Sequence, residues 1–248
     1  MTDTRAPAGK FTIDGKPVPF REGETIMEAA AAAGVYIPHL CYQPGFAPHG
    51  SCKLCTVEVG MRRVAACTTK AANGMVVANN TTALNDDRRA LTEMLFIEGN
   101  HLCPACEKTG NCQLQAVGYF LGMTTLHFEH FYPPRSLDAS HPDIVLDRNR
   151  CILCELCVRA SRDVDGKNVF GIGGRGIHSH VIVNAASGRL ADTDLTLDDA
   201  AAHVCPVGAI LVKREAYKVP IGKRIYDGHP ISEVSLADAR QKREGGDD

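Results

Sequence analysis

The sequence predicts an α+β protein that consists of several small units. Short segments typical of strands alternate with short segments typical of helices, and stretches rich in proline and glycine separate them. A length of 248 residues allows one large domain or two to three small ones. The 44% hydrophobic and 23% charged content is ordinary for a globular protein, and no run of about 18 apolar residues predicts a transmembrane helix.

The first unit is expected over residues 1–84. Residues 11–20 predict a β-hairpin, because an Asp-Gly pair in their middle supplies a turn. The alanine-rich residues 24–33 predict a helix that Gly34 ends. Three short strands should follow, at residues 56–59, 62–66 and 75–78.

Residues 85–135 should form a small helical unit. An amphipathic helix is expected over residues 85–97, followed by a cysteine-rich segment and a second helix over residues 113–121. The polar start and the apolar positions of the first helix predict that it packs through one face. The residues expected on that face are Ala90, Leu91, Met94, Leu95 and Ile97.

Residues 136–218 should form a third unit, and residues 219–248 should form a tail. Residues 131–140 contain a proline pair and are expected to be a linker. Within the third unit, residues 181–183 predict a strand and residues 196–202 the start of a helix. We expect the tail to lie on a partner or to be disordered near its end.

Charge and cysteine content exclude several functional classes. A net charge of −2, a pI near 6.5 and the absence of tryptophan argue against a nucleic-acid binder. Eleven cysteines cannot all pair in disulfides, and residues 1–10 lack the apolar core of a secretory signal. We therefore expect the chain in the reducing cytoplasm. Clustered thiols in that compartment indicate metal or redox chemistry. The basic pairs are expected to be solvated or interfacial, at Arg62-Arg63, Arg88-Arg89 and Lys223-Arg224.

The first group of cysteines is Cys41, Cys52, Cys55 and Cys67. Four thiolates are the ligand set of a [2Fe–2S] cluster, two for each iron, and nearby glycines let backbone N–H groups approach the sulfides. Plant-type ferredoxins have four residues in the first gap, where this chain has ten. A zinc site is the alternative, although four-cysteine zinc sites usually show two pairs of the C-x2-C type and this group has one.

The second group is Cys103, Cys106 and Cys112. A [4Fe–4S] cluster has four irons to ligate, so three cysteines leave one iron without a protein ligand. His101 lies two residues before the first cysteine and is the expected fourth ligand; the alternative is a surface loop histidine. A neutral imidazole would make the cluster less negative and raise its reduction potential.

The third group is Cys151, Cys154, Cys157 and Cys205, the last of which precedes a proline. This C-x2-C-x2-C run with a remote Cys-Pro is the pattern by which bacterial ferredoxins hold a [4Fe–4S] cluster. Ser161 stands where a two-cluster ferredoxin has a further cysteine, so a single cluster is expected. The three groups use four, three and four cysteines, which accounts for all 11.

Residues 171–176 match the glycine pattern G-x-G-x-x-G of dinucleotide-binding folds. That motif requires a helix that opens on it, whereas the residues that follow here alternate like a strand. The segment also lies between ligands of the third group. We therefore expect a loop with several positive φ angles and no nucleotide site.

The ordered motifs resemble the N-terminal iron–sulfur region of the large subunit of respiratory NADH dehydrogenase (complex I). They resemble still more closely the small iron–sulfur subunit of NAD-reducing [NiFe] hydrogenases. Besides the first group of cysteines, the segments on which the resemblance rests are EGNHLCPACEKTGNCQLQ (98–115), CILCELCVR (151–159) and VCPVGAI (204–210). Complex I subunits place the histidine four residues before the first cysteine of the second group, where this chain has Gly99.

The resemblance implies both a fold and a function. The fold would combine a β-grasp [2Fe–2S] ferredoxin-like domain, a small helical [4Fe–4S] domain with one histidine and three cysteine ligands, and a bacterial-ferredoxin-like [4Fe–4S] domain. The chain would be a non-catalytic subunit that relays single electrons between the hydrogenase small and large subunits and a diaphorase subunit with FMN and NAD.

The resemblance also implies the compartment and the partners of this chain. It would belong to a cytoplasmic hetero-oligomer, with neither nucleic acid nor membrane as a partner. The equivalent subunit of an NAD-dependent formate dehydrogenase or of a complex I-like dehydrogenase is the alternative. A zinc-bound structural or adaptor protein is a remote alternative, because it would leave the ordered cluster motifs without a role.

Overall fold

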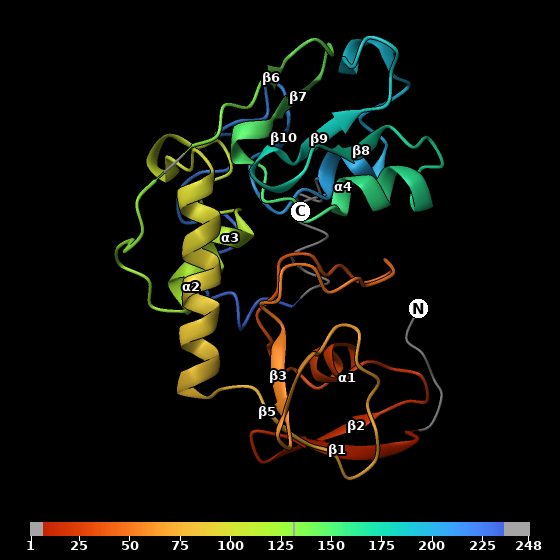
Figure 1. Ribbon diagram of the computed structural model, residues 1–248, viewed down its shortest axis with the longest axis vertical. Coiled ribbons are helices and arrows are strands. Elements are labelled where there is room, and N and C mark those ends of the chain that lie inside the picture. The colour runs from red at the N-terminus through yellow and green to blue at the C-terminus, as the bar shows by residue number, and fades with distance from the viewer. Residues whose placement is uncertain (1–6, 131, 236–248) are drawn as a thin grey trace. The chain divides into compact units, whose positions relative to one another are not determined.

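The computed structural model describes residues 7–130 and 132–235, which form two compact units of mixed helix and strand structure (Figure 1). The first unit ends at Leu91 and the second begins at Thr92. The expected mixture of short helices and strands is confirmed. Within the described ranges, no helix has both the length and the apolar character that a membrane crossing needs.

Five short strands form the mixed sheet of the first unit. They are β1 (Gly9–Ile13), β2 (Lys16–Phe20), β3 (Thr56–Val59), β4 (Arg62–Ala65) and β5 (Val76–Ala78). Their order is β2–β1–β5–β3–β4, and β1 pairs with β5 in parallel. The predicted hairpin joins β1 to β2, and its turn has positive φ at Asp14 (49°) and Gly15 (78°), the backbone that an Asp-Gly pair tolerates.

Helix α1 (Ile26–Ala32) begins at a capping box and packs against β2. The N–H of Glu28 donates to Thr25 Oγ1 at 3.2 Å, and the N–H of Thr25 donates to the Glu28 carboxylate at 2.7 Å. Gly34, with a φ of 70°, follows the helix as predicted. The apolar core between helix and sheet includes Phe11, Ile13, Val18, Phe20, Ile26, Met27, Ala29 and Ala30.

Helix α2 (Thr82–Glu98) begins three residues before its predicted start. The prediction of its buried face is wrong in part, because Met94 is exposed. The buried row instead starts at Leu84 and continues through Arg88 and Thr92, which lie four residues apart. Polar side chains therefore occupy part of the buried stripe, and the apolar pattern alone misplaces it.

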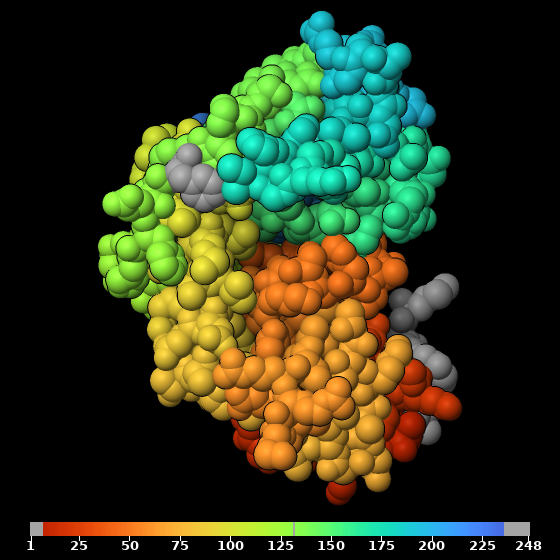
Figure 2. Space-filling model, viewed as in Figure 1, coloured from red at the N-terminus to blue at the C-terminus, as the bar shows by residue number. Residues whose placement is uncertain are grey.

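Two small antiparallel sheets belong to the second unit. One has the order β10–β7–β6 and consists of β6 (Leu137–Asp138), β7 (Ile144–Asp147) and β10 (Ile210–Val212). The other pairs β8 (Phe170–Gly173) with β9 (His180–Val183), and the turn between them lies on the surface (teal in Figure 2). The linker predicted at 131–140 is wrong at β6, which pairs with β7; residue 131 lies outside the described ranges.

The helices of the second unit are short. They are α3 (Gln113–Phe120), α4 (Leu156–Arg159), which continues into one π turn (Ala160–Val164), and α5 (Ala200–His203). Short 3₁₀ turns lie at Cys103–Ala105, Arg148–Arg150, Gly176–His178 and Leu190–Asp192. The second unit thus consists largely of turns and loops, in which most of its cysteines lie; Cys157 lies in α4.

The described part of the tail returns to its own chain. The N–H of Tyr226 donates to the carbonyl of Gly110 at 2.9 Å, and Ile225 is buried. Residues of the tail therefore contact the second unit, and the prediction that the tail lies on a partner stays a prediction. The predicted disorder near the end concerns residues 236–248, which lie outside the described ranges.

Candidate metal centres

The four cysteines of the first group lie in two pairs. The N–H of Cys52 donates to the sulfur of Cys41 at 3.5 Å, and the sulfurs of Cys55 and Cys67 are 3.4 Å apart. A hydrogen bond from Cys52 lowers the pKa of Cys41 to about 4, and a hydrogen bond from Cys55 lowers the pKa of Cys67. In each pair one thiolate is thus stabilised, while the same hydrogen bond raises the pKa of its partner, Cys52 or Cys55. A bound metal would displace the proton that each partner keeps.

Strand pairing brings Cys55 and Cys67 together. Cys55 directly precedes β3, and Cys67 follows the end of β4. In the antiparallel register Thr56 lies opposite Ala65, and the N–H of Ala66 donates to the carbonyl of Cys55 at 3.0 Å. The two cysteines thus meet at the open end of a hairpin although 12 positions separate them in sequence.

A buried arginine holds the backbone on both sides of Cys55. Arg88 is 2% exposed; its Nε donates to the carbonyl of Leu54 at 3.0 Å, and its Nη2 donates to the carbonyl of Thr56 at 2.9 Å. Its two terminal nitrogens also donate to the backbone and side-chain oxygens of Asn79 at 2.6 and 2.8 Å. The prediction that Arg88 is solvated or interfacial is therefore wrong, because buried acceptors share its charge.

The three cysteines of the second group lie around a 3₁₀ turn and the start of α3. Cys103 begins the turn, Cys106 follows it, and Cys112 is the N-cap residue of α3. Burial raises the pKa of Cys112 to about 12, and charge on Cys106 and Cys103 also raises it. The three thiols are therefore close in space, and a bound metal would displace their protons.

His101 is buried next to this group and has the features of a ligand. In the part of the chain that the structure describes, its Nε2 has no hydrogen-bond partner, while the ring also bonds to the backbone of Leu95. Burial, and then the charge of Arg150, lowers the pKa of His101 to about 4, so the ring is neutral near pH 7. A neutral imidazole oriented through one nitrogen is the form in which histidine binds metals.

Gly99 leaves the space that the ring of His101 occupies. A Cβ atom at position 99 would overlap Nε2 of His101 and would lie 2.9 Å from the carbonyl oxygen of Asn149. A glycine is required at such a close approach. The ring at position 101 thus fills the space into which a side chain at position 99 would project.

The closely spaced cysteines of the third group lie in one loop, Cys151 and Cys154, and in the helix α4 that follows it, Cys157. Leu153 (φ 52°) and Glu155 (φ 58°) adopt left-handed backbone in the loop, and the N–H of Leu153 donates to the sulfur of Cys151 at 3.4 Å. Burial raises the pKa of Cys151 to about 11, and charge on Cys205 also raises it. Burial likewise raises the pKa of Cys157, together with the charges of the other three cysteines. The remote Cys205 is therefore close to the loop.

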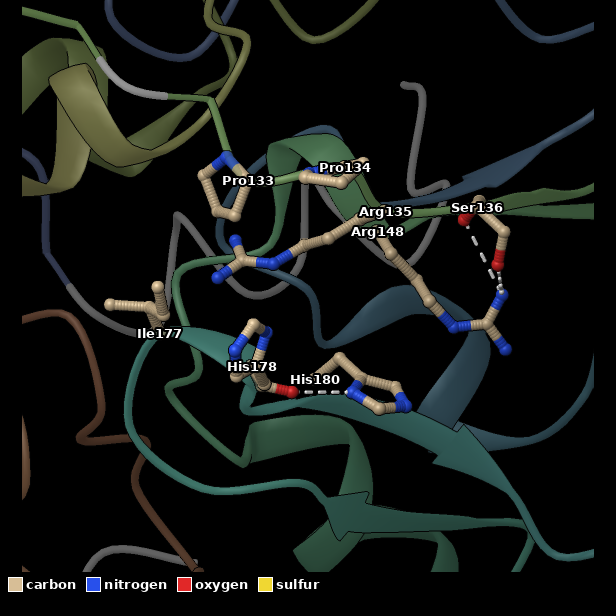
Figure 3. Close-up of a pocket in the computed structure, with 8 residues that line it drawn as sticks. All are labelled: Pro133, Pro134, Arg135, Ser136, Arg148, Ile177, His178 and His180. Atoms are coloured by element: carbon tan, nitrogen blue, oxygen red, sulfur yellow. Dashed lines mark hydrogen bonds between the residues drawn. The ribbon is translucent and has the colours of Figure 1, made fainter.

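The glycine motif near this group joins two strands. Residues 171–173 belong to β8, and β9 follows after a turn with positive φ at Gly174 (77°) and Gly176 (56°). His178 and His180, just beyond the glycines, line a cavity (Figure 3). The predicted absence of a dinucleotide-type helix after the glycines is confirmed, although the first three residues form a strand where a loop was expected.

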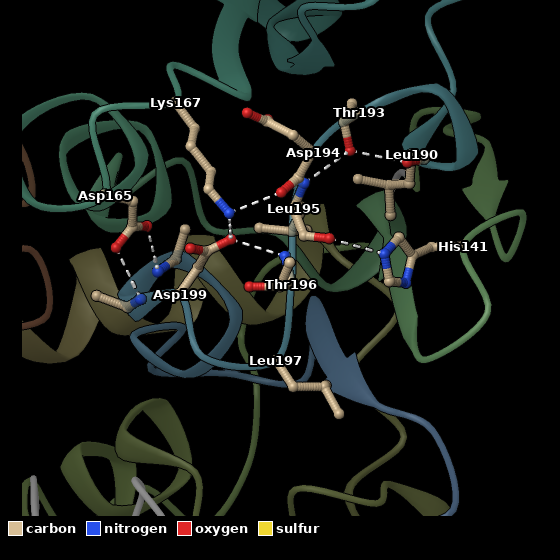
Figure 4. Close-up of polar contacts among 12 residues, drawn as sticks. His141, Asp165, Lys167, Leu190, Thr193, Asp194, Leu195, Thr196, Leu197 and Asp199 are labelled. Atoms are coloured by element: carbon tan, nitrogen blue, oxygen red, sulfur yellow. Dashed lines mark hydrogen bonds and ion pairs between the residues drawn. The ribbon is translucent and has the colours of Figure 1, made fainter.

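Polar contacts hold the segment that leads to Cys205 (Figure 4). The Asp199 carboxylate accepts the N–H of Thr196 at 2.7 Å and pairs with Lys167 Nζ at 2.8 Å. The Asp165 carboxylate accepts the first two N–H groups of α5 at 2.9 and 3.0 Å. The helix start predicted within 196–202 therefore occurs only at α5, because Asp199 holds the preceding residues in a turn.

The second and third groups lie in loops that touch. A Cβ atom at Gly208 would lie 3.1 Å from the sulfur of Cys106. Arg150, which directly precedes Cys151, donates from Nη1 to the same sulfur at 3.8 Å. It also pairs with Glu107, and with Asp147 at 3.0 Å. Its guanidinium therefore contacts the second group of thiols from a position next to the third.

Among residues 7–130 and 132–235, no group of three or more His, Cys, Asp or Glu side chains is arranged to hold a metal ion. The structure brings the predicted ligands together as paired thiols, as thiols that share a loop, and as a histidine with an unpartnered nitrogen. The assignment of individual ligands stays a prediction. Sequence patterns carry no signal for the contacts of Arg88 with buried backbone carbonyls or of Arg150 with the sulfur of Cys106.

Three family models match successive parts of the chain. Residues 8–82 match the 2Fe-2S iron-sulfur cluster binding domain, and residues 88–127 match the NADH-ubiquinone oxidoreductase-G iron-sulfur binding region. Residues 144–212 match the 4Fe-4S single cluster domain. Each range contains one of the three groups of cysteines. Fold and thiol groups together define an iron–sulfur protein.

Two proteins are similar to this chain over most of its length. The gamma subunit of the NAD-reducing hydrogenase HoxS of Cupriavidus necator is 43% identical over 219 residues, which are 88% of this chain and 93% of that protein. A chain in a crystal structure of NAD+-reducing [NiFe]-hydrogenase in the H2-reduced state is 52% identical, with a TM-score of 0.90 over 94% of this chain and 99% of that one. The chain belongs to the family of NAD-reducing hydrogenase gamma subunits.

Larger dehydrogenase subunits are similar over part of their length. An NADH-quinone oxidoreductase subunit of Rhizobium meliloti is 35% identical over 214 residues, and the match covers 24% of it. The mitochondrial NADH-ubiquinone oxidoreductase 78 kDa subunit of Candida albicans is 34% identical over 220 residues, and the match covers 29% of it. The resemblance to both hydrogenase and complex I subunits is therefore confirmed.

Proposed function

We propose that this chain relays single electrons through three iron–sulfur clusters between a [NiFe] hydrogenase module and a subunit that binds FMN and NAD. The observation that carries the proposal is the likeness, at 52% identity, to a chain of an NAD+-reducing [NiFe]-hydrogenase. The complex would couple H2 oxidation to NAD reduction, and this chain would have no substrate site of its own. None of its 11 cysteines, all within the described residues, forms a disulfide, which suits the reducing cytoplasm.

Three ligand sets follow from the groups of thiols. A β-grasp domain over residues 1–84 would hold a [2Fe–2S] cluster through Cys41, Cys52, Cys55 and Cys67. A helical domain over residues 85–135 would hold a [4Fe–4S] cluster through His101, Cys103, Cys106 and Cys112. A ferredoxin-like domain over residues 136–218 would hold the second [4Fe–4S] cluster through Cys151, Cys154, Cys157 and Cys205, before the tail (219–248).

The residues of the chain orient and tune these sites. Clusters supply one-electron redox steps when bound, and a flavin in the partner subunit exchanges paired for single electrons. Strand pairing presents Cys55 and Cys67, Leu153 and Glu155 shape the loop of the third set, and the neutral ring of His101 offers an unpartnered nitrogen. Seven of the 11 cysteines are buried, which limits the access of water to most of the proposed ligands.

The native complex, purified without oxygen, tests the proposal directly. We expect the chain to be recovered with small and large hydrogenase subunits and a flavin subunit, and to carry about ten iron atoms. Recovery with a formate-oxidising subunit in place of hydrogenase subunits would reverse the choice of partner. A colourless chain that contains zinc would exclude the clusters.

Replacing His101 tests the least conventional ligand. His101→Ala should change the spectrum and potential of the middle cluster only, because the other ligand sets keep their thiols. His101→Cys should retain the cluster and lower its potential, since a thiolate adds the negative charge that imidazole lacks. Electron paramagnetic resonance during a redox titration measures both effects. The exposed His229 gives the control His229→Ala, which should change neither; an unaltered middle cluster in His101→Ala would refute ligation.

Arg150 should raise the potential of the middle cluster. Its positive charge and its contact with the sulfur of Cys106 stabilise the more negative, reduced state. Arg150→Gln should therefore lower that potential by about 59 mV, the value for a tenfold change in a one-electron equilibrium. A redox titration compares it with Arg162→Gln, which removes an exposed arginine. Equal potentials in both variants would contradict the assigned role.

A further inference from the structure

The second unit contains a basic cavity that none of the proposed ligand sets uses (Figure 3). Its volume is about 580 Å³, and its walls include Arg135, Arg148, His178 and His180. None of the residues that line it carries a carboxylate. We propose that this cavity binds a phosphate group, supplied either by inorganic phosphate or by a phosphate monoester.

Arg135 provides an unsatisfied charged donor in the wall of the cavity. Its side chain is 5% exposed, and its Nη2 pairs with Glu98. Within the described residues, its buried Nη1 has no hydrogen-bond partner. In Figure 3 its guanidinium lies between Pro133 and His178, inside the space that these residues enclose. A buried charged donor without an acceptor is costly, so an anion that accepts from Nη1 would be stabilised there.

Arg148 provides a second positive charge that the fold holds in place. Its Nε donates to the carbonyl of Val181 at 2.7 Å, and its Nη1 donates to Ser136 Oγ at 3.2 Å. These bonds join the segment before β6 to strand β9, so the guanidinium is fixed before any ligand arrives. Preformed sites bind more tightly because less side-chain entropy is lost.

The chemistry of the wall suits phosphate better than a carboxylate. Phosphate carries nearly two negative charges near neutral pH and several acceptor oxygens, which match two planar guanidinium groups. A carboxylate carries one negative charge and would neutralise only one of the two guanidinium groups. The cavity is within the size range of small-molecule sites, so the remainder of a phosphate monoester would also fit, against Pro133 and Ile177.

Calorimetric titration of the cluster-loaded, full-length chain tests the site. Inorganic phosphate, AMP and adenosine are titrated in turn, in a chloride buffer without oxygen. We expect saturable binding of phosphate or AMP and none of adenosine; tighter binding of AMP would identify the monoester, and equal or tighter binding of phosphate the free ion. The absence of saturable binding for both phosphate compounds would overturn the proposal.

Three variants locate the binding in this cavity. Arg135→Gln removes the positive charge but keeps a polar amide, and should weaken phosphate binding at least tenfold. Ile177→Glu alters an exposed side chain in the wall, leaves the core intact and should weaken binding through repulsion. Arg214→Gln removes an exposed arginine outside the cavity and should have no effect. Binding that is unchanged in both Arg135→Gln and Ile177→Glu would place the phosphate elsewhere and overturn the proposal.

The same samples separate this site from the proposed function. Phosphate binding to a chain that proves to lack the third cluster would preserve the cavity site and overturn the cluster assignment.

Discussion

Replacing Cys154 with alanine should remove one [4Fe–4S] cluster and stop electron transfer through the chain. Cys154 is the middle cysteine of its loop and is buried, so water cannot easily take its place as a ligand. The iron content should fall from about ten to about six atoms per chain, and one [4Fe–4S] signal should vanish from the electron paramagnetic resonance spectrum. NAD reduction driven by H2 should fall to the background rate in the assembled complex.

The matched control is Cys52→Ala. Cys52 and Cys154 lie in different compact units, so each variant should leave the other unit folded. Cys52→Ala should remove the [2Fe–2S] signal and retain both [4Fe–4S] signals. An iron content that is unchanged in Cys154→Ala would show that the third ligand set is wrong.

Replacing Arg88 with methionine should lower the free energy of unfolding by about 3–5 kcal/mol. Methionine keeps most of the side-chain volume but donates no hydrogen bonds. The carbonyl oxygens of Leu54, Thr56 and Asn79 would then lose their arginine donor in the interior. Each buried polar group left unpaired costs about 1–3 kcal/mol. The loop around Cys55 should therefore become both less stable and more mobile.

Urea unfolding with two probes measures this effect. Circular dichroism reports the loss of secondary structure, and visible absorption reports the loss of the [2Fe–2S] site; both midpoints should move to lower urea in Arg88→Met. The neighbouring Arg89 is exposed and pairs with Asp86 at 2.7 Å, so Arg89→Met should change the unfolding free energy by less than about 0.5 kcal/mol. Similar shifts in the two variants would contradict the structural role of Arg88.

Features that depend on neighbouring residues could be predicted from the sequence. The hairpin of β1 and β2 was predictable because an Asp-Gly pair tolerates positive φ. Helix α1 was predictable because a run of alanines favours a helix and Gly34 ends it. The three groups of thiols were predictable because cluster ligands repeat at short spacings, and the family models match the same three regions. In these cases the local chemistry restricts the backbone to few conformations.

Features that depend on distant partners could not be predicted in this way. Arg88 and Arg89 form one basic pair in the sequence, yet only Arg88 finds buried carbonyls, and those belong to strands and loops up to 34 positions away. The same limit applies to Arg150, whose contact with Cys106 spans 44 positions. The contact of the tail with its own chain was not predictable either, because no local pattern shows that Tyr226 would bond to Gly110.

The overlap between position 99 and the ring of His101 makes these two positions mutually exclusive. A histidine introduced at 99 cannot coexist with His101 in its present place, and a chain that loses His101 alone keeps a glycine with nothing to fill the space. Placing the histidine at position 99 in place of 101 therefore requires both residues to be substituted, and either substitution alone damages the site. Within this family, residues 99 and 101 should accordingly change together.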